Sequence, residues 1–600
     1  MALGKRISPC HRNADGELVN AMTGKTWVQI PYEKSTAEML YKSLNVGFPL
    51  CAILVQRGIE SKLDAEKFLW PKLAYLDDPF KIKNVDRAVD VLIRIIENNS
   101  RVAIVGDYDV DGITSITLLI NVLKAFGINS DFFVPRRACE GYGLSSEIIE
   151  RILSEKKYDT VIALDCGTNS ANEIDFLRKN GIEVLVVDHH QAKSLPVARC
   201  CIVNPHVGDG EGYDKYKILC TVGLVFRLCY ALLRVLRKKD DKRALNYSLK
   251  NDLDLVTLGT IADMMYMVGE NRILCKFGLK IINGKMRRPG IEALCKSADI
   301  HAGSNIRHSD ISFKLCPRLN ACGRLTDAIL PIKMMLSDDF NEAMTYAYEL
   351  DETNKERQLI EKEITRQAED LVRQHYANDS GLVLYDKDWH AGVVGIISGK
   401  FARGYAKPCI VLGSERDVAK GSGRSSNGPN LIDVLSDCAA LLETWGGHPF
   451  AVGVSILPEK IDAFRKKFNE SVQKYSANLP QGESIEYSLE LNLEDIDNGF
   501  MDEVEMLQPF GQKNPDPIFL LKNIKVHNLP ETFGARKTHV KFWLIDCYSK
   551  RTLAVAWHAS HNIPPMRTPL DLLVTVNRET WNRIRSTCLY VVDWRVSRES

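Results

Sequence analysis

The sequence contains no run of about 18 uncharged apolar residues, so it predicts no membrane-spanning helix. Its first residues, MALGKRISPCHR, lack the apolar stretch of a secretory signal. The 16 cysteines include no C-x-x-C pair, which argues against a Cys-rich zinc site and against a disulfide framework. We therefore expect a cytoplasmic protein with free thiols and no membrane partner.

A strong overall charge is also missing, because the 600 residues carry a net charge of only +1. Any site for a polyanion must therefore arise from local clustering of basic residues. Internal repeats and low-complexity tracts are absent as well. The apolar fraction of 45% is typical of globular proteins, and the length predicts several domains.

Apolar runs at 102–105, 132–134, 161–164 and 184–187 alternate with stretches of helical period. This alternation predicts an α/β fold with a mainly parallel sheet. A long helix rich in Glu, Lys, Arg and Gln should join it to a second, smaller α/β domain, and short β-rich segments predict a final small barrel. The expected parts are an N-terminal helical and loop region at 1–85, a catalytic α/β domain at 86–285, a helical connector at 286–376, the smaller α/β domain at 377–475 and the barrel at 484–600.

Three aspartates crowd into five residues after the first predicted strand. The segment VGDYDVDG places Asp107, Asp109 and Asp111 there. Carboxylates this close repel one another unless a cation neutralises them. Aspartate and glycine are also common in plain turns, but three alternating aspartates exceed what a turn requires. A cation site is therefore the favoured interpretation.

Two further strand ends carry the same residue types. IALDCG ends one predicted strand with Asp165, and VLVVDHH ends the next with Asp188, His189 and His190. In open α/β sheets the carboxyl ends of the strands converge on one crevice, where ligands bind. We therefore expect these strand ends to deliver their Asp and His side chains to one place.

A fourth candidate, Asp263, lies in LVTLGTIADMM on a predicted helix. A single aspartate on a helix is more often a solvated residue. Asp263 becomes a candidate metal ligand only in combination with the other three elements. Carboxylates with one or two imidazoles and no thiolate suit Mn²⁺ or Mg²⁺, and the imidazole favours Mn²⁺. Five or more ligands can hold two ions about 3.5–4 Å apart, a common arrangement for phosphoryl hydrolysis.

These residues resemble the DHH phosphoesterase superfamily, which is named for its Asp-His-His motif, and the order of the four elements also fits. CPRLNACGRL at 316–325, DWHAGVVGIISG at 388–399, GSGRS at 421–425 and WGGHPFAVGVSI at 445–456 are similar to the RecJ branch of single-strand DNA exonucleases. The resemblance spans about 100–460. It implies a DHH catalytic domain, a DHH-associated substrate-binding domain and a single-strand-binding barrel of the oligonucleotide-binding (OB) type.

The resemblance also implies roles for single residues. The metal ligands would be Asp107, Asp109, Asp111, Asp165, His189 and Asp263. His190 would lie next to the scissile phosphate, with Asp165 and Asp188 as further catalytic residues. A pocket for a terminal 5′ phosphate would be formed by Arg137, Ser422 and Arg424. Further substrate contacts would come from Arg318, Asn320, Arg324, His390, Gly446, Gly447 and His448.

The residues themselves leave alternatives open. Arginine offers a rigid fork for phosphate oxygens, and a Gly-Ser-Gly-Arg-Ser run lets backbone N–H groups approach a phosphate closely. Alone, however, GSGRS is more often a flexible turn, and His390 and His448 are as often structural histidines. The sequence departs from the branch at Cys322, where a small Ala is usual, and at 266–267, where Tyr-Met stands for Pro-Leu. Neither departure touches a proposed ligand.

The C-terminal segment 517–600 is locally basic, with 13 Lys and Arg against 6 Asp and Glu. Its tryptophans at 543, 557, 581 and 594 interleave with that charge. Exposed rings that stack on bases, beside cations that follow the backbone, are typical of a single-strand binding platform. Any single one of these tryptophans is still more often a core residue.

The resemblance implies a metal-dependent, single-stranded-DNA-specific exonuclease that works in the 5′-to-3′ direction in DNA repair and recombination. It implies two divalent metal ions, with Mn²⁺ preferred or Mg²⁺, and a monomer that acts beside a single-strand-binding protein and a helicase. One alternative is a phosphodiesterase for short oligonucleotides or cyclic dinucleotides, but such enzymes are typically shorter and lack the barrel. Another is an inactive nucleic-acid-binding scaffold, but such relatives lose metal carboxylates that are all present here.

Overall fold

The computed structural model describes residues 23–136, 140–141, 143–192, 200–208, 214–285, 287–301, 303–415, 417–426, 428–477, 484–545, 549–581 and 584–597. The chain divides into two compact units. The barrel unit comprises Met1–Asp78, Met264–Phe277 and Gly482–Ser600, and the α/β unit comprises Pro79–Asp263 and Gly278–Gln481. No helix in the described part of the chain is long and apolar enough to cross a membrane. The described cysteines are all free and buried.

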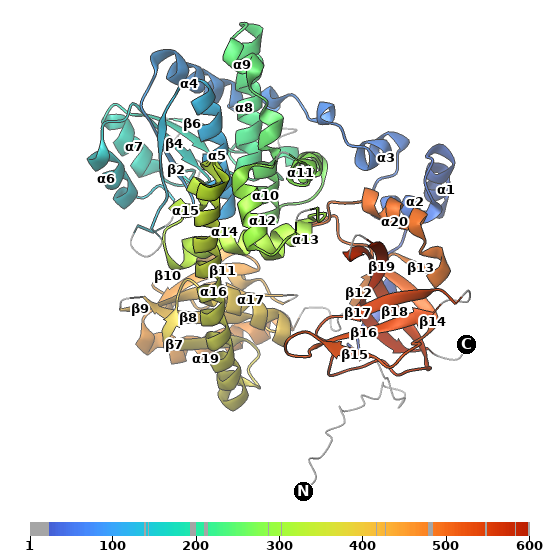
Figure 1. The fold of residues 1–600 in the computed structure, drawn as a ribbon. Coiled ribbons are helices and arrows are strands. Elements are labelled where there is room, and N and C mark those ends of the chain that lie inside the picture. The colour runs from blue at the N-terminus through green and yellow to red at the C-terminus, as the bar shows by residue number, and fades with distance from the viewer. Residues whose placement is uncertain are drawn as a thin grey trace. The chain divides into compact units, whose positions relative to one another are not determined.

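The first sheet of the α/β unit is parallel throughout, in the order β3-β2-β4-β5-β6 (Figure 1). Its strands are β2 (Val102–Gly106), β3 (Ser130–Phe133), β4 (Thr160–Leu164), β5 (Glu183–Val187) and β6 (Cys201–Val203). β2 and β4 are buried at every position, which explains why their sequences are continuous apolar runs. The predicted α/β fold with a mainly parallel sheet is confirmed.

Helices cover both faces of this sheet. They are α4 (Val85–Asn98), α5 (Val110–Ala125), α6 (Ser146–Glu155), α7 (Ala171–Lys179) and α8 (Thr221–Lys238). On one face, Ile148 of α6 and Leu177 of α7 share a core with Val161 and Val184 of the strands. The strands also contact α4, α5 and α8. Buried polar side chains, Asp107, Asp165 and Asp188, directly follow the carboxyl ends of β2, β4 and β5.

A run of helices separates the two sheets in sequence. Its members are α9 (Lys242–Asn246), α10 (Leu253–Ala262), α11 (Gly269–Ile282), α12 (Pro289–Ser297), α13 (His308–Asp310), α14 (Cys316–Leu325), α15 (Ile329–Leu336) and α16 (Phe340–Leu371). The last is the long helix that the sequence predicts. Asp339 caps its start, because its side chain accepts a hydrogen bond from the backbone N–H of Glu342.

The second sheet of the α/β unit runs in the order β10-β11-β9-β8-β7, and only the β7–β8 pair is parallel. Its strands are β7 (Leu382–His390), β8 (Cys409–Glu415), β9 (Val418–Arg424), β10 (Thr444–His448) and β11 (Ala451–Ile456), and its helices are α17 (Val394–Tyr405), α18 (Leu431–Ser436) and α19 (Ile461–Ser476). Separate apolar clusters fill its two faces, one against α18 and α19 and the other against α16 and α17.

The barrel unit is built on a seven-stranded sheet in the order β13-β14-β18-β19-β17-β16-β15. The strands are β13 (Leu489–Leu491), β14 (Phe519–Lys525), β15 (Glu531–Phe533), β16 (His539–Ile545), β17 (Arg551–Ala556), β18 (Pro569–Trp581) and β19 (Ile584–Val596), and helix α20 (Asn498–Met506) belongs to the same unit. β16 alternates buried and exposed residues, so one of its faces lines the core and the other meets solvent.

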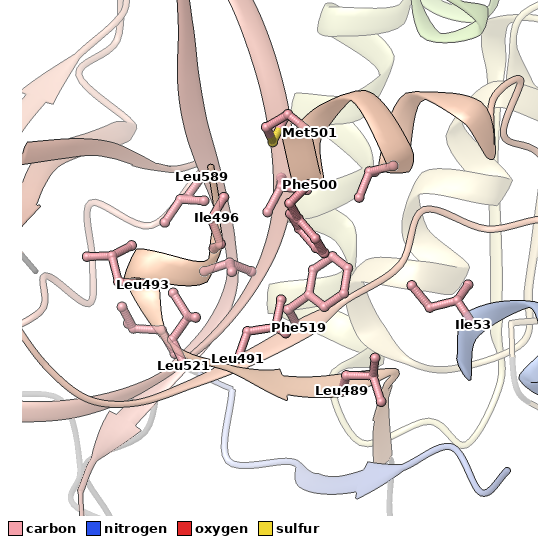
Figure 2. Close-up of a cluster of buried hydrophobic side chains, with 14 of the residues drawn as sticks. Ile53, Leu489, Leu491, Leu493, Ile496, Phe500, Met501, Phe519, Leu521 and Leu589 are labelled. Atoms are coloured by element: carbon pink, nitrogen blue, oxygen red, sulfur yellow. The ribbon is translucent and has the colours of Figure 1, made fainter. Parts of the chain in front are cut away.

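The N-terminal region belongs to the core of the barrel unit. β1 (Thr26–Gln29) pairs in parallel with β12 (Ser484–Tyr487), and the helices α1 (Lys34–Ser43), α2 (Phe48–Gln56) and α3 (Lys62–Leu69) follow it. Ile53 of α2 lies in one apolar cluster with Leu489, Phe500 and Phe519 (Figure 2). The sequence offered no chemistry for this region, and the structure gives it a packing role.

Candidate metal centre and active site

Polar side chains from three strand ends and one helix end meet in the α/β unit. Two separate groups of three have their ligand atoms within 4.8 Å of one another: Asp107, Asp109 and Asp165, and Asp111, His189 and Asp263. Asp165, His189 and His190 form a third group, which connects the first two. The convergence of strand ends that the sequence predicts is confirmed by this geometry. Two disjoint groups of oxygen and nitrogen ligands leave room for two cations.

The turn after β2 is set by the start of α5. Asp109 is the N-cap of that helix, and its Oδ1 accepts hydrogen bonds from the backbone N–H groups of Asp111 and Gly112 at 3.0 and 3.1 Å. A Cβ on Gly112 would lie 2.3 Å from the carbonyl oxygen of Asp107. Only glycine therefore lets the start of α5 approach the backbone of Asp107 so closely.

Asp111 is held by the start of another helix. Its Oδ2 and Oδ1 accept hydrogen bonds from the backbone N–H groups of Thr221 and Val222, the first residues of α8, at 2.7 and 2.8 Å. The hydroxyl of Thr221 donates to Oδ1 of Asp165 at 2.8 Å. Sequence analysis missed Thr221. Its position at the first turn of an apolar helix was the only available signal, and that signal does not point to a ligand site.

His189 lies between carboxylates of both groups. Its Nε2 is 3.4 Å from Asp165, 3.6 Å from Asp263 and 3.9 Å from Asp111. Burial lowers the pKa of His189, but these carboxylates outweigh it and raise the pKa to about 10. The imidazolium thus occupies the place of a cation in a site surrounded by negative charge.

His190 is oriented by Asp188. Oδ1 of Asp188 lies 2.8 Å from Nδ1 of His190, and it also accepts the backbone N–H groups of His189 and His190 at 2.8 and 3.1 Å. Asn204 donates to the carbonyl oxygen of His190 at 2.9 Å. Asp188 belongs to none of the three ligand groups of the described residues. Its contacts instead fix the ring of His190, with Nε2 as the nitrogen that Asp188 does not contact.

The carboxylates are short of positive charge. Burial, followed by the charges of Asp165 and Asp263, raises the pKa of Asp109 to about 7. Burial and Asp165 likewise raise the pKa of Asp263 to about 6. Oδ2 of Asp263 is buried and accepts no hydrogen bond from any described residue. Buried oxygens with raised pKa values and an unused acceptor are what a divalent cation would satisfy.

A second set of predicted residues lies on β9, beside α17. A Cβ on Gly395, in the first turn of α17, would lie 3.1 Å from the hydroxyl oxygen of Ser422, and one on Gly399 would lie 3.8 Å from Cγ of Arg424. Burial lowers the pKa of Arg424, whose guanidinium donates to the carbonyl oxygen of Gly423 at 2.8 Å but forms no ion pair with any described carboxylate. A helix N-terminus beside an unpaired guanidinium suits a phosphate group. Arg137, the third predicted member, lies outside the described residues.

Helix α14 links the two parts of the α/β unit. A Cβ on Gly323 would lie 2.7 Å from the carbonyl oxygen of Tyr108, inside the aspartate turn. The next residue, Arg324, donates to the carbonyl oxygen of Gly392 at 3.2 Å, and Nδ1 of His390 accepts the backbone N–H of Gly392 at 3.1 Å. Arg324 and His390 therefore connect the aspartate turn with the start of α17.

The remaining predicted substrate residues are placed differently. Arg318 donates to Asp351 at 2.9 Å and to the carbonyl oxygen of Lys314 at 2.7 Å, so its guanidinium is engaged within the protein. Asn320 is half-buried on the same helix. Gly446, Gly447 and His448 are exposed on the hairpin strand β10. A Cβ on Gly446 would meet nothing within 4 Å, whereas Gly447 has a φ of 140° that favours glycine.

The barrel unit carries its own set of exposed rings. Trp543 is 41% exposed and Trp557 48% exposed, whereas Trp594 is only 3% exposed and fills the core. The side chain of Trp581 lies outside what the structure describes. The ring of Trp557 lies 4.9 Å from His539 and 5.8 Å from Tyr590, measured between centroids. Two of the four tryptophans are therefore available for stacking.

Three family models match the chain. The model described as the DHH family, N-terminal domain, covers residues 101–260. The DHHA1 domain covers 378–474, and the RecJ OB domain covers 487–593. The OB-like barrel that the sequence predicts is confirmed by the last of these.

Curated relatives extend the likeness over most of the chain. The single-stranded-DNA-specific exonuclease RecJ of Bacillus subtilis is 32% identical over 94% of this chain and 70% of its own length. RecJ of Escherichia coli is 33% identical over 78% of this chain and 82% of its own length. Among solved structures, RecJ from Thermus thermophilus in complex with Mn²⁺ matches with a TM-score of 0.78 and 25% identity, covering 96% of this chain and 80% of that one.

Proposed function

The chain belongs to the family of RecJ single-stranded-DNA-specific exonucleases, and from this membership we propose that it removes nucleotides from a free 5′ end of single-stranded DNA. It is a metal-dependent phosphodiesterase that cleaves single-stranded DNA in repair and recombination. The single observation that carries the chemistry is the pair of disjoint ligand groups at the strand ends. Their full set of carboxylates supports an active enzyme rather than a nucleic-acid-binding scaffold.

The residues present fit two divalent cations, Mn²⁺ or Mg²⁺. One ion would be held by Asp107, Asp109 and Asp165, and the other by Asp111, His189 and Asp263. Oxygen ligands with a single imidazole suit Mn²⁺ somewhat better than Mg²⁺. Bound there, the ions would lower the pKa of a water and neutralise charge on the phosphate. Binding requires His189 to be neutral, so the ions would displace its second proton.

The protein's own groups would orient the phosphate and manage protons. The Asp188 carboxylate holds Nδ1–H of His190, which keeps the ring in one tautomer, with Nε2 as the nitrogen that would face the scissile phosphate. An imidazole in that place can donate to a phosphate oxygen or to the leaving oxygen. Thr221 keeps Asp165 in place through its hydroxyl, and the N–H groups of α8 do the same for Asp111. These contacts fix the ligand set before any cation arrives.

The direction of attack would come from the β9 and α17 site. Ser422, Arg424 and the first turn of α17 offer a hydroxyl, an unpaired guanidinium and backbone N–H groups. A terminal phosphate carries more charge than an internal one and would bind such a site in preference. Since α14 joins this region to the aspartate turn, a strand seated by its 5′ phosphate would present its first phosphodiester to the metal centre.

The barrel would hold the rest of the strand. Trp543 and Trp557 supply exposed rings, and the basic residues of 517–600 supply charge. The barrel unit would bind the strand and the α/β unit would cleave it. We infer a monomer that works in the cytoplasm beside a helicase and a single-strand-binding protein. A helicase would generate the single strand on which the enzyme acts.

The test is an assay with one strand offered in four forms. Linear strands labelled at the 5′ end, linear strands labelled at the 3′ end, circular single strands and blunt duplexes are incubated with Mn²⁺, Mg²⁺ or chelator. We expect release of labelled mononucleotide from the 5′ label at once, and no cutting of circles or of duplexes. Cutting of circles as fast as linear strands would contradict an exonuclease. Release of the 3′ label first would contradict the direction alone.

A further inference from the structure

A cavity of about 540 Å³ lies at the end of the first sheet that faces away from the carboxylates. Its walls come from α4, from the last turn of α7 and from the beginnings of β5 and β6. Glu183 begins β5, whereas Asp188 directly follows its other end. Since the strands are parallel, this cavity lies at their amino ends and the metal centre at their carboxyl ends.

Three guanidiniums line this cavity, and two of them have no carboxylate partner. Arg94 pairs with Glu183 across the wall. The guanidiniums of Arg87, on the same face of α4, and of Arg178, at the end of α7, form no ion pair or hydrogen bond with the residues that the structure describes. Unpaired cations that line one cavity favour a ligand with a compact negative group.

The two unpaired guanidiniums also lie near a common point. Burial raises the pKa of Cys200 to about 11, and the positive charges of Arg178 and Arg87 act in the opposite direction on that same thiol. Arg87, Arg178 and Cys200 all line this one cavity, and the carboxylate of Asp175 also acts on the thiol. A single group with two negative charges could contact both guanidiniums.

The lining of the cavity is partly apolar and partly charged. Val91, Ile182 and Val184 are buried and line it together with the two cysteines, Cys200 and Cys201. Asp90 and Glu183 also line it and would repel the successive phosphates of a passing strand. The lining thus favours a small ligand with charge at one end and a flat apolar body at the other. Small-ligand sites commonly have volumes of about 300–1,000 Å³, which includes this one.

We propose that this cavity binds a nucleoside monophosphate, with its phosphate between Arg87 and Arg178 and its base against Val91, Ile182 and Val184. The carboxylate of Asp90 can accept hydrogen bonds from the sugar or the base. Nucleoside monophosphates are what an exonuclease releases, so the identity of the natural ligand as a reaction product rests on the proposed function. The site itself rests only on the cavity and its charges.

The test is calorimetric titration of the full chain with thymidine 5′-monophosphate in the presence of chelator. The chelator removes binding that needs metal ions, and the variant Arg424→Ala removes the terminal-phosphate site, so both are used as the background. We expect the nucleotide still to bind there, inorganic phosphate to bind more weakly, and thymidine without phosphate not to bind. An absence of nucleotide binding in this background would overturn the proposal. Equal affinity for inorganic phosphate would overturn the assigned class of ligand.

Variants then locate the binding site. In the same background, Arg87→Glu with Arg178→Glu should weaken nucleotide binding by about a hundredfold or more, since each lost bond to a charged phosphate is worth about tenfold. Lys179→Glu is the matched control, because it changes the same charge on the neighbouring residue of α7 without lining the cavity. If charge reversal unfolds the protein, Arg87→Gln with Arg178→Gln should still give a clear loss. Undiminished binding in a folded double variant would contradict the site.

These experiments separate the two proposals. Exonuclease activity is measured on the Arg87 and Arg178 variants made in the otherwise unaltered chain, with metal present, and should stay at the level of the Lys179→Glu control made in the same chain. A protein without nuclease activity that still binds the nucleotide through these arginines would contradict the proposed function and leave this site standing. An active nuclease that binds no nucleotide in the absence of metal would contradict this site and leave the proposed function standing.

Discussion

The two units of the chain arrange their functional side chains in different ways. In the α/β unit, the residues of the metal centre directly follow a strand or start or end a helix, so a short motif carries each of them. In the barrel unit, Trp543 lies on β16 and Trp557 directly follows β17, and the core beneath them joins segments that are remote in sequence. Nε1 of Trp27 donates to Asp593 at 2.8 Å, for example, across 566 residues. The first kind of site can be recognised from sequence motifs, whereas the second depends on the assembled core.

The strongest way to sharpen this comparison is to remove one ligand from the metal centre. Asp165→Ala takes a carboxylate out of a set that acts together, and we expect cleavage to fall by a factor on the order of 10⁴ or more. The protein should still fold, but its unfolding temperature should fall, because His189 and Thr221 lose a buried charged partner. End-labelled strands at saturating Mn²⁺ measure the rate, and calorimetry measures Mn²⁺ binding. Asp338→Ala, a carboxylate that is 90% exposed, is the control. Turnover near the unaltered level would contradict the ligand assignment.

A weaker effect is expected at Asp188, which orients a neighbour. Asp188→Asn keeps the shape of the side chain but loses the charge that holds Nδ1–H of His190. We expect kcat to fall by about 10²–10⁴ with little change in KM, as for other carboxylates that set a histidine tautomer. Mn²⁺ affinity should stay within about tenfold, because outer contacts to a metal site usually matter by 10–100-fold at most. Loss of Mn²⁺ binding as complete as in Asp165→Ala would make Asp188 a ligand instead.

A third prediction concerns the core of the barrel unit. Ile53 is 1% exposed and packs with residues from the C-terminal segment, so Ile53→Ala should lower the free energy of unfolding of this unit by about 2–5 kcal/mol. Met39→Ala, at a residue that is 45% exposed on α1, is the matched control and should cost far less. In a denaturant titration, the loss of DNA binding measures unfolding of the barrel unit, and the loss of Mn²⁺ binding measures unfolding of the α/β unit. Equal effects of the two variants would mean that the N-terminal helices are not part of this core.

The sequence predicted the fold class and the convergence of the metal site because both follow from local patterns. A buried parallel strand is a continuous apolar run, and its carboxyl end has a defined position, so Asp165 and His189 could be expected to meet. Thr221 and Asn204 could not be predicted, because they act through a helix start and a side-chain amide that look ordinary in sequence. The role of Ile53 was equally hidden, since its partners lie more than four hundred residues away. By resemblance Arg318 would contact the DNA, and in the structure its guanidinium donates to Asp351.

The packing of 26–69 also determines how the barrel is best tested. Deleting everything from residue 484 would leave β1 and Ile53 without their partners, so a truncated chain would expose an apolar core and report on stability rather than on DNA. Single surface variants avoid this difficulty. They must be chosen by exposure, since Trp594 belongs to the core and Trp543 does not.

The smallest expected effect is at the exposed rings, and it can be divided between stacking and charge. Trp543 and Arg551 both lie on the outer side of neighbouring strands, because Trp543 pairs with Leu553 and Arg551 lies two residues before it. Trp543→Ala removes a ring that can stack on a base, worth about 1–3 kcal/mol, and should weaken binding of a long strand without changing its salt dependence. Arg551→Gln removes a cation and should instead lower the slope of log affinity against log salt by about 1.

Binding constants for a long single strand across a salt series measure both quantities. Hydrolysis of a dinucleotide on the same preparations should be unaffected in either variant, since every ligand of the metal centre belongs to the other unit. If Trp543→Ala flattens the salt slope while Arg551→Gln leaves it unchanged, charge and stacking have been assigned to the wrong residues. If neither variant changes binding and both proteins are folded, the strand does not use this face of the barrel. The metal centre would then still be recognisable from its motifs, but the exposed rings of the barrel would not mark a binding surface.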